Sequence, residues 1–283
     1  MKPGRGSRTA VMVGAARAAA HGKTDIARFS DPTAFALLPK DAQKEVERFR
    51  SGAAPAGMKD RLKRAYLEQG AKVMGVRTVA IDDAVRAAAN PQLVILGAGL
   101  DGRAWRMSEL RHVVVFEVDH PDTQREKRER VGALTPASDD IRFVPVDFER
   151  DSLDEALTKA GHDTAHATTW IWEGVVMYLS MPDIEATLDV IARRSAPGSR
   201  LIVLYHQRAF ILRIVGFVVR RLGEPLKSSF TSDAMRALLE RFGFPITRDG
   251  NIHDFGLELS STIGETTRRA RHLRIAIADR KKG

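Results

Sequence analysis

From Pro91 onward the sequence alternates between short apolar runs and segments rich in helix-forming residues, and this alternation restricts the fold more than any other feature. Each apolar run is almost continuously hydrophobic, as strands are when helices cover both faces of a parallel sheet. The five runs are Leu93–Leu96, Val113–Val118, Ile141–Val146, Thr169–Trp172 and Leu201–Tyr205. The helical candidates between them are Gly102–Leu110, Pro121–Val131, Ser152–Ala160 and Pro182–Ser195. The pattern predicts a doubly wound α/β fold with a mostly parallel sheet.

The segments outside this alternation are predicted to be mainly helical. We expect one domain over residues 1–283, with a helical N-terminal extension at 1–90 and a Rossmann-like core at 91–283. The core carries an insert at about 208–242, after the fifth strand. The helices expected in the extension are Asp41–Arg50, Met58–Gln69 and Arg77–Ala89, and those of the insert are the apolar segment Ala209–Val219 and a helix from about Ser232 to Phe242. Late strands are expected near Leu257–Ser261 and Leu273–Ala278.

Composition and the apolar segments exclude several kinds of site and of targeting segment. Hydrophobic residues make up 43% of the chain, enough for a packed core, and the absence of cysteine excludes disulfides, cysteine-bound zinc and a cysteine nucleophile. Arg17 interrupts the apolar stretch near the start, so residues 1–20 predict a small-residue helix and not a signal peptide. Ala209–Val219 is too short to span a bilayer and contains Arg213. We expect a cytoplasmic protein without a membrane span.

The formal net charge of +9 is concentrated in part at the C-terminus, where seven Lys or Arg residues follow residue 267 against one acid, Asp279. A solvated terminus is the favoured interpretation of this basic tail. No basic patch interleaved with aromatic residues marks a nucleic-acid groove, so no nucleic-acid partner is expected. The oligomeric state does not follow from the sequence.

A glycine-rich turn follows the first predicted strand and precedes a helix. Gly97, Ala98 and Gly99 form its centre, and glycines there let the backbone turn sharply and approach a ligand closely. With Gly102 the turn also matches the GxGxxG pattern of dinucleotide-binding folds. Asp119, at the end of the second strand, suits the ribose hydroxyls of either NAD or S-adenosylmethionine (SAM). The turn alone therefore leaves both an NAD-dependent oxidoreductase and a SAM-binding enzyme open.

Polar residues that follow the third and fourth strands favour SAM. Asp147 suits the exocyclic amine of adenine, and Phe148 offers a backbone donor and a flat apolar neighbour. Glu173 ends the fourth strand in an otherwise apolar segment, where a buried carboxylate needs partners. A dinucleotide fold also lacks a long helical extension before its first strand.

Together these motifs resemble the leucine carboxyl methyltransferase-like family of SAM-dependent methyltransferases, and its bacterial branch, abundant in actinobacteria, in particular. The matching segments are Arg77–Asp83, Gly97–Ala104, Phe116–Pro121, Val146–Phe148 and Glu173–Leu179, with looser matches at Arg28–Ala34 and Gly223–Pro225. The likeness spans nearly the whole chain and implies a class I methyltransferase fold. One departure is Gly102, where the family usually has Thr.

The resemblance implies a role for each matched residue. Arg77 would bind the SAM carboxylate, while Glu173 would lie near the methionine amino group. The backbone of Gly97, Ala98 and Gly99 would pack against the methionine and ribose. Asp119 would hold the ribose hydroxyls, with His120 beside it. Asp147 and Phe148 would recognise adenine, and an early basic residue such as Arg17 would lie near the site.

The sequence gives fewer indications of the methyl acceptor and of the residues that assist methyl transfer. A sulfonium is an excellent leaving group, so the protein's task is mainly alignment and exclusion of water. A carboxylate acceptor needs no base, whereas a hydroxyl benefits from one, and His206 after the fifth strand is a candidate. No catalytic residue is assigned, and no metal is expected because no cluster has metal-ligand spacing. We expect O-methylation of a hydrophobic small molecule, with carboxyl methylation of a protein C-terminus as an alternative.

Overall fold

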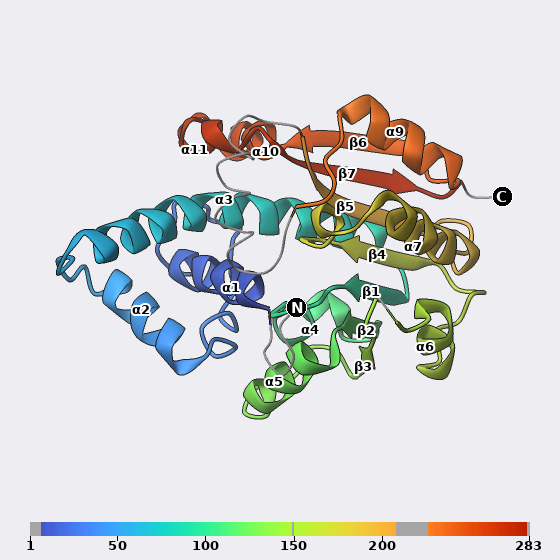
Figure 1. Cartoon of the computed structure of the whole chain (residues 1–283), viewed down its shortest axis with the longest axis horizontal. Helices are drawn as coiled ribbons and strands as arrows, with labels where there is room; N and C mark the ends of the chain where they lie inside the picture. Colours follow the sequence, from blue (N-terminus) through green and yellow to red (C-terminus); the bar gives the residue numbers. More distant parts are fainter. Residues whose placement is uncertain (1–6, 149, 208–225, 282–283) are drawn as a thin grey trace.

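The computed structural model describes residues 7–148, 150–207 and 226–281, and Figure 1 shows how their elements are arranged. The helices are α1 (Arg8–Ala20), α2 (Lys40–Arg50), α3 (Met58–Ala88), α4 (Arg103–Arg106), α5 (Pro121–Val131), α6 (Leu153–Lys159), α7 (Met181–Arg193), α9 (Ser232–Arg241), α10 (Ile252–Leu259) and α11 (Ser261–Thr267). Three short 3-10 helices are η1 (Ser108–Leu110), η2 (Val176–Tyr178) and η3 (Arg268–Ala270). The strands are β1 (Gln92–Leu96), β2 (Val114–Asp119), β3 (Asp140–Pro145), β4 (Thr168–Trp172), β5 (Arg200–His206), β6 (Ile246–Asn251) and β7 (Leu273–Asp279).

The seven strands form one mixed sheet in the order β3-β2-β1-β4-β5-β7-β6. β1 to β5 are parallel to one another, and β7 pairs antiparallel with both β5 and β6. The chain runs outward from β1 through β2 to β3 and then returns to the other side of β1 as β4. In open α/β sheets ligands bind at such a reversal, outside the carboxyl ends of the strands. The five predicted strands and the doubly wound α/β class are confirmed.

Alternate residues of the strands face two separate hydrophobic layers. Ile95 and Ile202 point into the layer formed with α1, α2, α3, α4 and α10. Trp170 and Val203 point into the opposite layer, which includes α6, α7 and α9. Because both faces are buried, each strand can be apolar along its whole length, which explains the continuous runs in the sequence.

The region before β1 is helical, as predicted, but α3 is a single helix of 31 residues where two were expected. Gly75 falls in the gap between these two predicted helices, where glycine favours a break. Instead it lies within α3, where a Cβ would come 2.7 Å from Cδ1 of Ile26. Close packing against the segment between α1 and α2, and not a turn, accounts for this glycine. In Figure 1 the first half of α3 projects to the left of the sheet with α2 below it.

The prediction for the end of the chain is wrong in one place. The strand expected near Leu257–Ser261 does not form, because these residues belong to the end of α10 and the start of α11. Asn251 and Asp254 cap α10 reciprocally at its start, a local signal that favours a helix. The strand beside β7 is β6, whose polar sequence suits the edge of the sheet. The predicted strand Leu273–Ala278 corresponds to β7.

The predicted insert is only partly described. Its helix near Ser232–Phe242 is confirmed as α9, whereas Ala209–Val219 lies outside the described residues. Across the described ranges, no helix is long and apolar enough to cross a membrane.

Candidate cofactor and active site

The turn after β1 has the geometry for which the sequence predicted glycine. Gly97 and Gly99 have φ angles of 70° and 48°, which a side chain would disfavour. The backbone N–H groups of Gly97 and Ala98 both donate to the carbonyl oxygen of Val118, at 2.8 and 3.0 Å, and so tie the turn to β2. A Cβ on Gly97 would come 2.1 Å from Cγ2 of Val175. The turn is therefore closed tightly between β2 and the segment after β4.

Asp119, the last residue of β2, is anchored against this turn. Its carboxylate accepts the backbone N–H of Gly99 and, at 2.6 Å, that of His120. Burial raises the pKa of Asp119, while the two N–H donors act in the opposite direction. A carboxylate held in this way has a fixed position at the carboxyl edge of the sheet.

All nine residues predicted to bind the cofactor line one cavity of about 630 Å³ at this edge. They are Arg77, Gly97, Ala98, Gly99, Asp119, His120, Asp147, Phe148 and Glu173. They come from α3, the turn after β1, and the ends of β2, β3 and β4. Parallel strands end at the same edge of a sheet, and this is why residues so distant in sequence meet there.

Asp147 and Phe148 lie after β3, on the β2–β3 side of the cavity. Oδ2 of Asp147 is 3.9 Å from Nε2 of His120 and 3.8 Å from Nε of Arg150. The backbone N–H of Asp147 donates to Oδ2 of Asp151 at 2.8 Å. The Phe148 ring packs on the hydrophobic layer that contains α6. This combination of a carboxylate and an aromatic ring is what the sequence predicted for adenine.

Glu173 lies between two arginines at the opposite side of the cavity. Its Oε1 is 2.5 Å from Nε of Arg77, and its Oε2 is 3.1 Å from Nη1 of Arg103. Burial raises the pKa of this carboxyl, but Arg77 and Arg103 outweigh the effect, so the pKa lies below its ordinary value. Glu173 is therefore ionised at neutral pH. A paired cation and anion facing one cavity suit a zwitterionic amino-acid group such as that of methionine.

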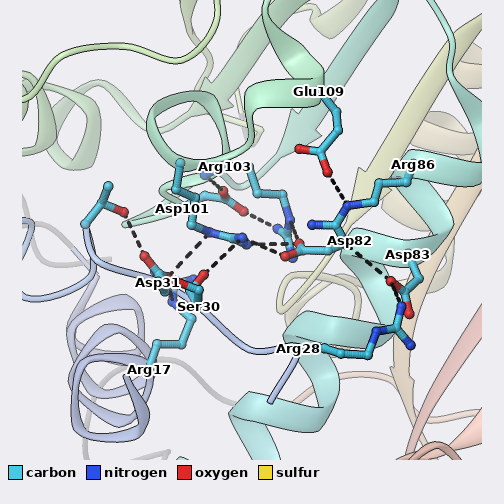
Figure 2. A network of polar contacts seen from close by, with 12 residues as sticks. Arg17, Arg28, Ser30, Asp31, Asp82, Asp83, Arg86, Asp101, Arg103 and Glu109 are labelled. Atoms are coloured by element: carbon cyan, nitrogen blue, oxygen red, sulfur yellow. Dashed lines mark hydrogen bonds and ion pairs between the residues drawn. The ribbon is translucent and has the colours of Figure 1, made fainter. Parts of the chain in front are cut away.

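The ion pair of Glu173 continues into a larger buried network of charges, part of which is shown in Figure 2. Arg103 contacts Asp82 and Asp101 as well as Glu173. Arg106 also binds Asp82, with Nη1 2.6 Å from Oδ2. In the loop after α1, Asp31 pairs with Arg17, whose Nε is 3.1 Å from Oδ2. The network joins the loop before α2, α3, α4 and the end of β4.

No role was predicted for four members of this network, although they lie within the segments that match the family: Asp31, Asp82, Asp101 and Arg103. The recurrence of Asp and Arg beside the glycine turn was the available signal. Arg17, suggested to lie near the site, does line the cavity. The start of α1 also lines it, through Thr9, Ala10 and Val13, for which the sequence offered no indication because small apolar residues are common in any helix.

The departure at Gly102 has a structural explanation. A Cβ at this position would lie 2.0 Å from Oγ1 of Thr33 and 3.2 Å from its Cβ. Thr33 comes from the loop between α1 and α2, and its hydroxyl donates to Oδ1 of Asp31 at 2.7 Å. A threonine hydroxyl from the N-terminal region therefore occupies the space that a side chain at residue 102 would need.

His206, the candidate base, ends β5 but is not among the residues that line the cavity. Its ring lies 5.8 Å from that of His272, and neither ring nitrogen has a hydrogen-bond partner among the described residues. Burial lowers the pKa of His206 to about 4, with His272 and Arg77 acting in the same direction. The imidazole is therefore neutral at neutral pH. Tyr178 of η2, by contrast, does line the cavity.

Solved structures share this architecture. A DUF574 family protein from Streptomyces avermitilis superposes with a TM-score of 0.63 at 14% identity, covering 97% of this chain and 98% of that one. A "putative methyltransferase" from Thermobifida fusca superposes with a TM-score of 0.57 at 13% identity, covering 99% and 97% of the two chains. At these identities the likeness concerns the fold alone, an α/β Rossmann-like fold.

Sequence comparison is more specific. A "Putative S-adenosyl-L-methionine-dependent methyltransferase" of Mycobacterium avium is 38% identical over 208 residues, which cover 71% of this chain and 67% of that protein. The chain spans about two thirds of the length of such relatives. The family model for leucine carboxyl methyltransferases matches residues 10–192, from α1 to α7. The match includes every predicted cofactor residue and decides against the NAD-dependent alternative, so the chain belongs to the leucine carboxyl methyltransferase family, whose cofactor is SAM.

Proposed function

We propose that this protein transfers the methyl group of SAM to a carboxylate or hydroxyl oxygen of a hydrophobic small molecule. The observation that carries the proposal is a single cavity in which the predicted cofactor residues continue into an apolar wall. That wall is formed by Ala10 and Val13 of α1 and by Met177, Tyr178 and Leu179. An apolar wall beside the cofactor residues suits an acceptor that is largely apolar.

The residues of the cavity match the chemical groups of SAM. Asp119 presents a fixed carboxylate to the ribose hydroxyls, and Asp147 with Phe148 suits adenine. Arg77 and Glu173 together suit the carboxylate and ammonium of the methionine part. Bound SAM supplies an electrophilic methyl group on a positively charged sulfur. The protein's own contribution is to hold the two reactants in line and to exclude water.

A base is not required for every acceptor. A carboxylate is already a nucleophile at neutral pH, whereas an alcohol or a phenol must lose a proton. In the described part of the chain, no group of three His, Asp or Glu residues is placed to hold a metal ion. Because the candidate base His206 does not line the cavity, we place carboxylic acids, which need no base, first among the candidate acceptors.

A methyl-transfer screen tests the proposal. Purified protein and methyl-labelled SAM are incubated with hydrophobic carboxylic acids, phenols, a peptide with a free C-terminal carboxylate, and a cell extract. We expect label in a base-labile ester of an apolar acid, and clearly less label with the Asp119→Ala variant at a limiting concentration of SAM. Label only in the peptide would instead establish carboxyl methylation of a protein C-terminus. Label on nitrogen or carbon, in an alkali-stable product, would refute O-methylation.

A further inference from the structure

Arg103 is almost completely buried and lies behind the cavity wall. It is 1% exposed and is not among the residues that line the cavity. Its guanidinium nevertheless contacts three carboxylates: Nε lies 2.8 Å from Oδ1 of Asp82, and Nη1 contacts Asp101 and Glu173. A buried guanidinium with this many charged partners is confined to one orientation.

The three carboxylates differ in where they lie. Asp101 and Glu173 line the cavity, whereas Asp82 belongs to α3 and lies outside its lining. Figure 2 shows Arg103 between Asp101 and Asp82. Arg103 thus connects two carboxylates of the cavity to α3, the helix that also carries Arg77. The backbone N–H of Arg103 adds a bond of 2.7 Å to Oδ1 of Asp101, which fixes the turn as well as the side chain.

The two oxygens of Glu173 are divided between two arginines. Arg77 lines the cavity and holds Oε1, while Arg103 holds Oε2 from outside it. A ligand carboxylate that binds Arg77 competes with Glu173 for that guanidinium. The contact with Arg103 does not face the ligand, so it can persist when the contact with Arg77 is shared.

We propose that Arg103 is a positioning residue for cofactor binding: it holds Glu173 and Asp101 at the methionine end of the cavity when Arg77 engages the cofactor. This inference rests on the proposed role of Glu173 toward the methionine amino group. Arg103 itself touches no ligand and acts through the two carboxylates.

Arg106 provides a matched control. It lies on the same short helix, its side chain is 5% exposed against 2% for Arg103, and it binds the same Asp82. Its other acidic partner is Asp31, at 3.8 Å, and it contacts neither Asp101 nor Glu173. If the network had a purely structural role, loss of either arginine would lower stability without a selective loss of cofactor binding in the Arg103 variants.

The test is calorimetric binding of S-adenosylhomocysteine, the demethylated product of SAM, to the full-length protein between pH 5.5 and 8.5. The variants are Arg103→Met, Arg103→Lys, Arg106→Met and Arg106→Lys, with the melting temperature of each measured in the same buffers. We expect Arg103→Met to bind about tenfold more weakly at pH 7.5, because it removes a charge-assisted contact of Glu173. Both Arg106 variants should bind within about twofold of the wild type even where they melt earlier.

The pH profile separates positioning from folding. Burial acts to raise the pKa of Glu173, and Arg103 is one of the two charges that lower it. Without Arg103 the pKa of Glu173 rises, so the affinity of Arg103→Met should fall further as the pH decreases from 7.5 to 5.5. Arg103→Lys, which retains the charge, should restore most of the wild-type profile. The Arg106 variants should follow the wild-type profile throughout.

The following outcomes would overturn the proposed role of Arg103. Equal losses of affinity in the Arg103 and Arg106 variants, with the same pH profile, would overturn the inference. If Arg103→Met does not fold, the comparison of Arg103→Lys with Arg106→Lys decides in the same way. Glu173→Gln is measured in parallel: if it binds S-adenosylhomocysteine as the wild type does, the assignment of Glu173 fails, and the inference about Arg103 fails with it.

Discussion

Asp119 illustrates how a single carboxylate can organise a loop and also face a ligand. It accepts N–H groups from Gly99 and His120, so its position is determined before any cofactor binds. A preorganised acceptor loses little freedom on binding, and this makes its hydrogen bonds to a ligand more effective. The same anchoring places the backbone of the glycine turn at the cavity.

At this scale we predict that Asp119→Ala weakens the binding of S-adenosylhomocysteine by about 1–3 kcal/mol, because charge-assisted hydrogen bonds to the ribose are lost. Asp119→Asn keeps the shape of the side chain but not its charge, so it should lose less of the binding free energy than Asp119→Ala. Asp139→Ala, which removes an acid that is 64% exposed, is the control and should bind normally. Titration calorimetry measures all three. Wild-type affinity in a folded Asp119→Ala protein would place the ribose elsewhere.

At the scale of elements, the N-terminal region and the glycine turn are fitted to each other. Thr33 fills the space beside Gly102, and Arg17 of α1 pairs with Asp31 of the following loop. α1 also approaches Gly99, where a Cβ would be 3.1 Å from that of Ala10. α1 and α3 therefore help to form the candidate cofactor cavity.

This close packing predicts an energetic coupling between residues 33 and 102. Gly102→Ala should reduce the free energy of unfolding by about 1–3 kcal/mol, because the new methyl group overlaps Oγ1 of Thr33. The φ of Gly102 is −111°, so backbone strain does not contribute. Thr33→Ala removes the hydroxyl, so Gly102→Ala should destabilise a Thr33→Ala protein less than it destabilises the wild type. The double variant should therefore show a favourable coupling free energy of about 0.5–3 kcal/mol.

Urea unfolding of the wild type, the two single variants and the double variant measures this coupling. Gly132→Ala is the matched control, since its φ is also negative and the nearest atom to a new Cβ is 3.8 Å away. It should change stability little. Strict additivity of the two single effects would show that residues 33 and 102 do not compete for the same space.

At the scale of the whole molecule, buried charges join the N-terminal region, α3 and α4 to the end of β4. Burial acts against ionisation of Asp82, Asp101 and Glu173, but the neighbouring arginines outweigh it and lower the pKa of each carboxyl. Glu117 behaves differently, because burial raises its pKa to about 7 despite the opposing charge of Lys127. The first group links the site to the N-terminal helices.

These pKa shifts predict acid sensitivity. A carboxyl whose pKa is lower in the folded state stabilises the fold above its ordinary pKa, and this contribution is lost as the pH falls through the folded value. We therefore expect the free energy of unfolding to decrease between pH 5 and pH 3, by up to about 1.4 kcal/mol per pH unit for each such group. Urea titrations at successive pH values measure the slope. Asp82→Asn should flatten it, and an unchanged slope in that variant would contradict the assignment.

Local sequence predicted much of the fold and several of the residues that line the candidate cavity. Continuous apolar runs predicted β1 to β5 because both faces of a parallel sheet are buried. Asp119, Asp147 and Glu173 could be named because strand ends converge at one edge of such a sheet. The errors had two different sources. Gly75 lies within α3, where Ile26, from a distant part of the chain, packs closely on it. At α10 a local signal was missed, because Asn251 and Asp254 cap that helix reciprocally.

What the sequence by itself determined is therefore the order of strands and helices, the glycine turn, and the carboxylates that follow the strands. Each of these is encoded by residues next to one another in the chain. Only the tertiary structure decided which charges pair: Glu173 meets Arg77 across 96 residues and Arg103 across 70. Ion pairs have no periodicity along the sequence, because a buried charge takes whichever opposite charge the packing of distant elements brings within reach.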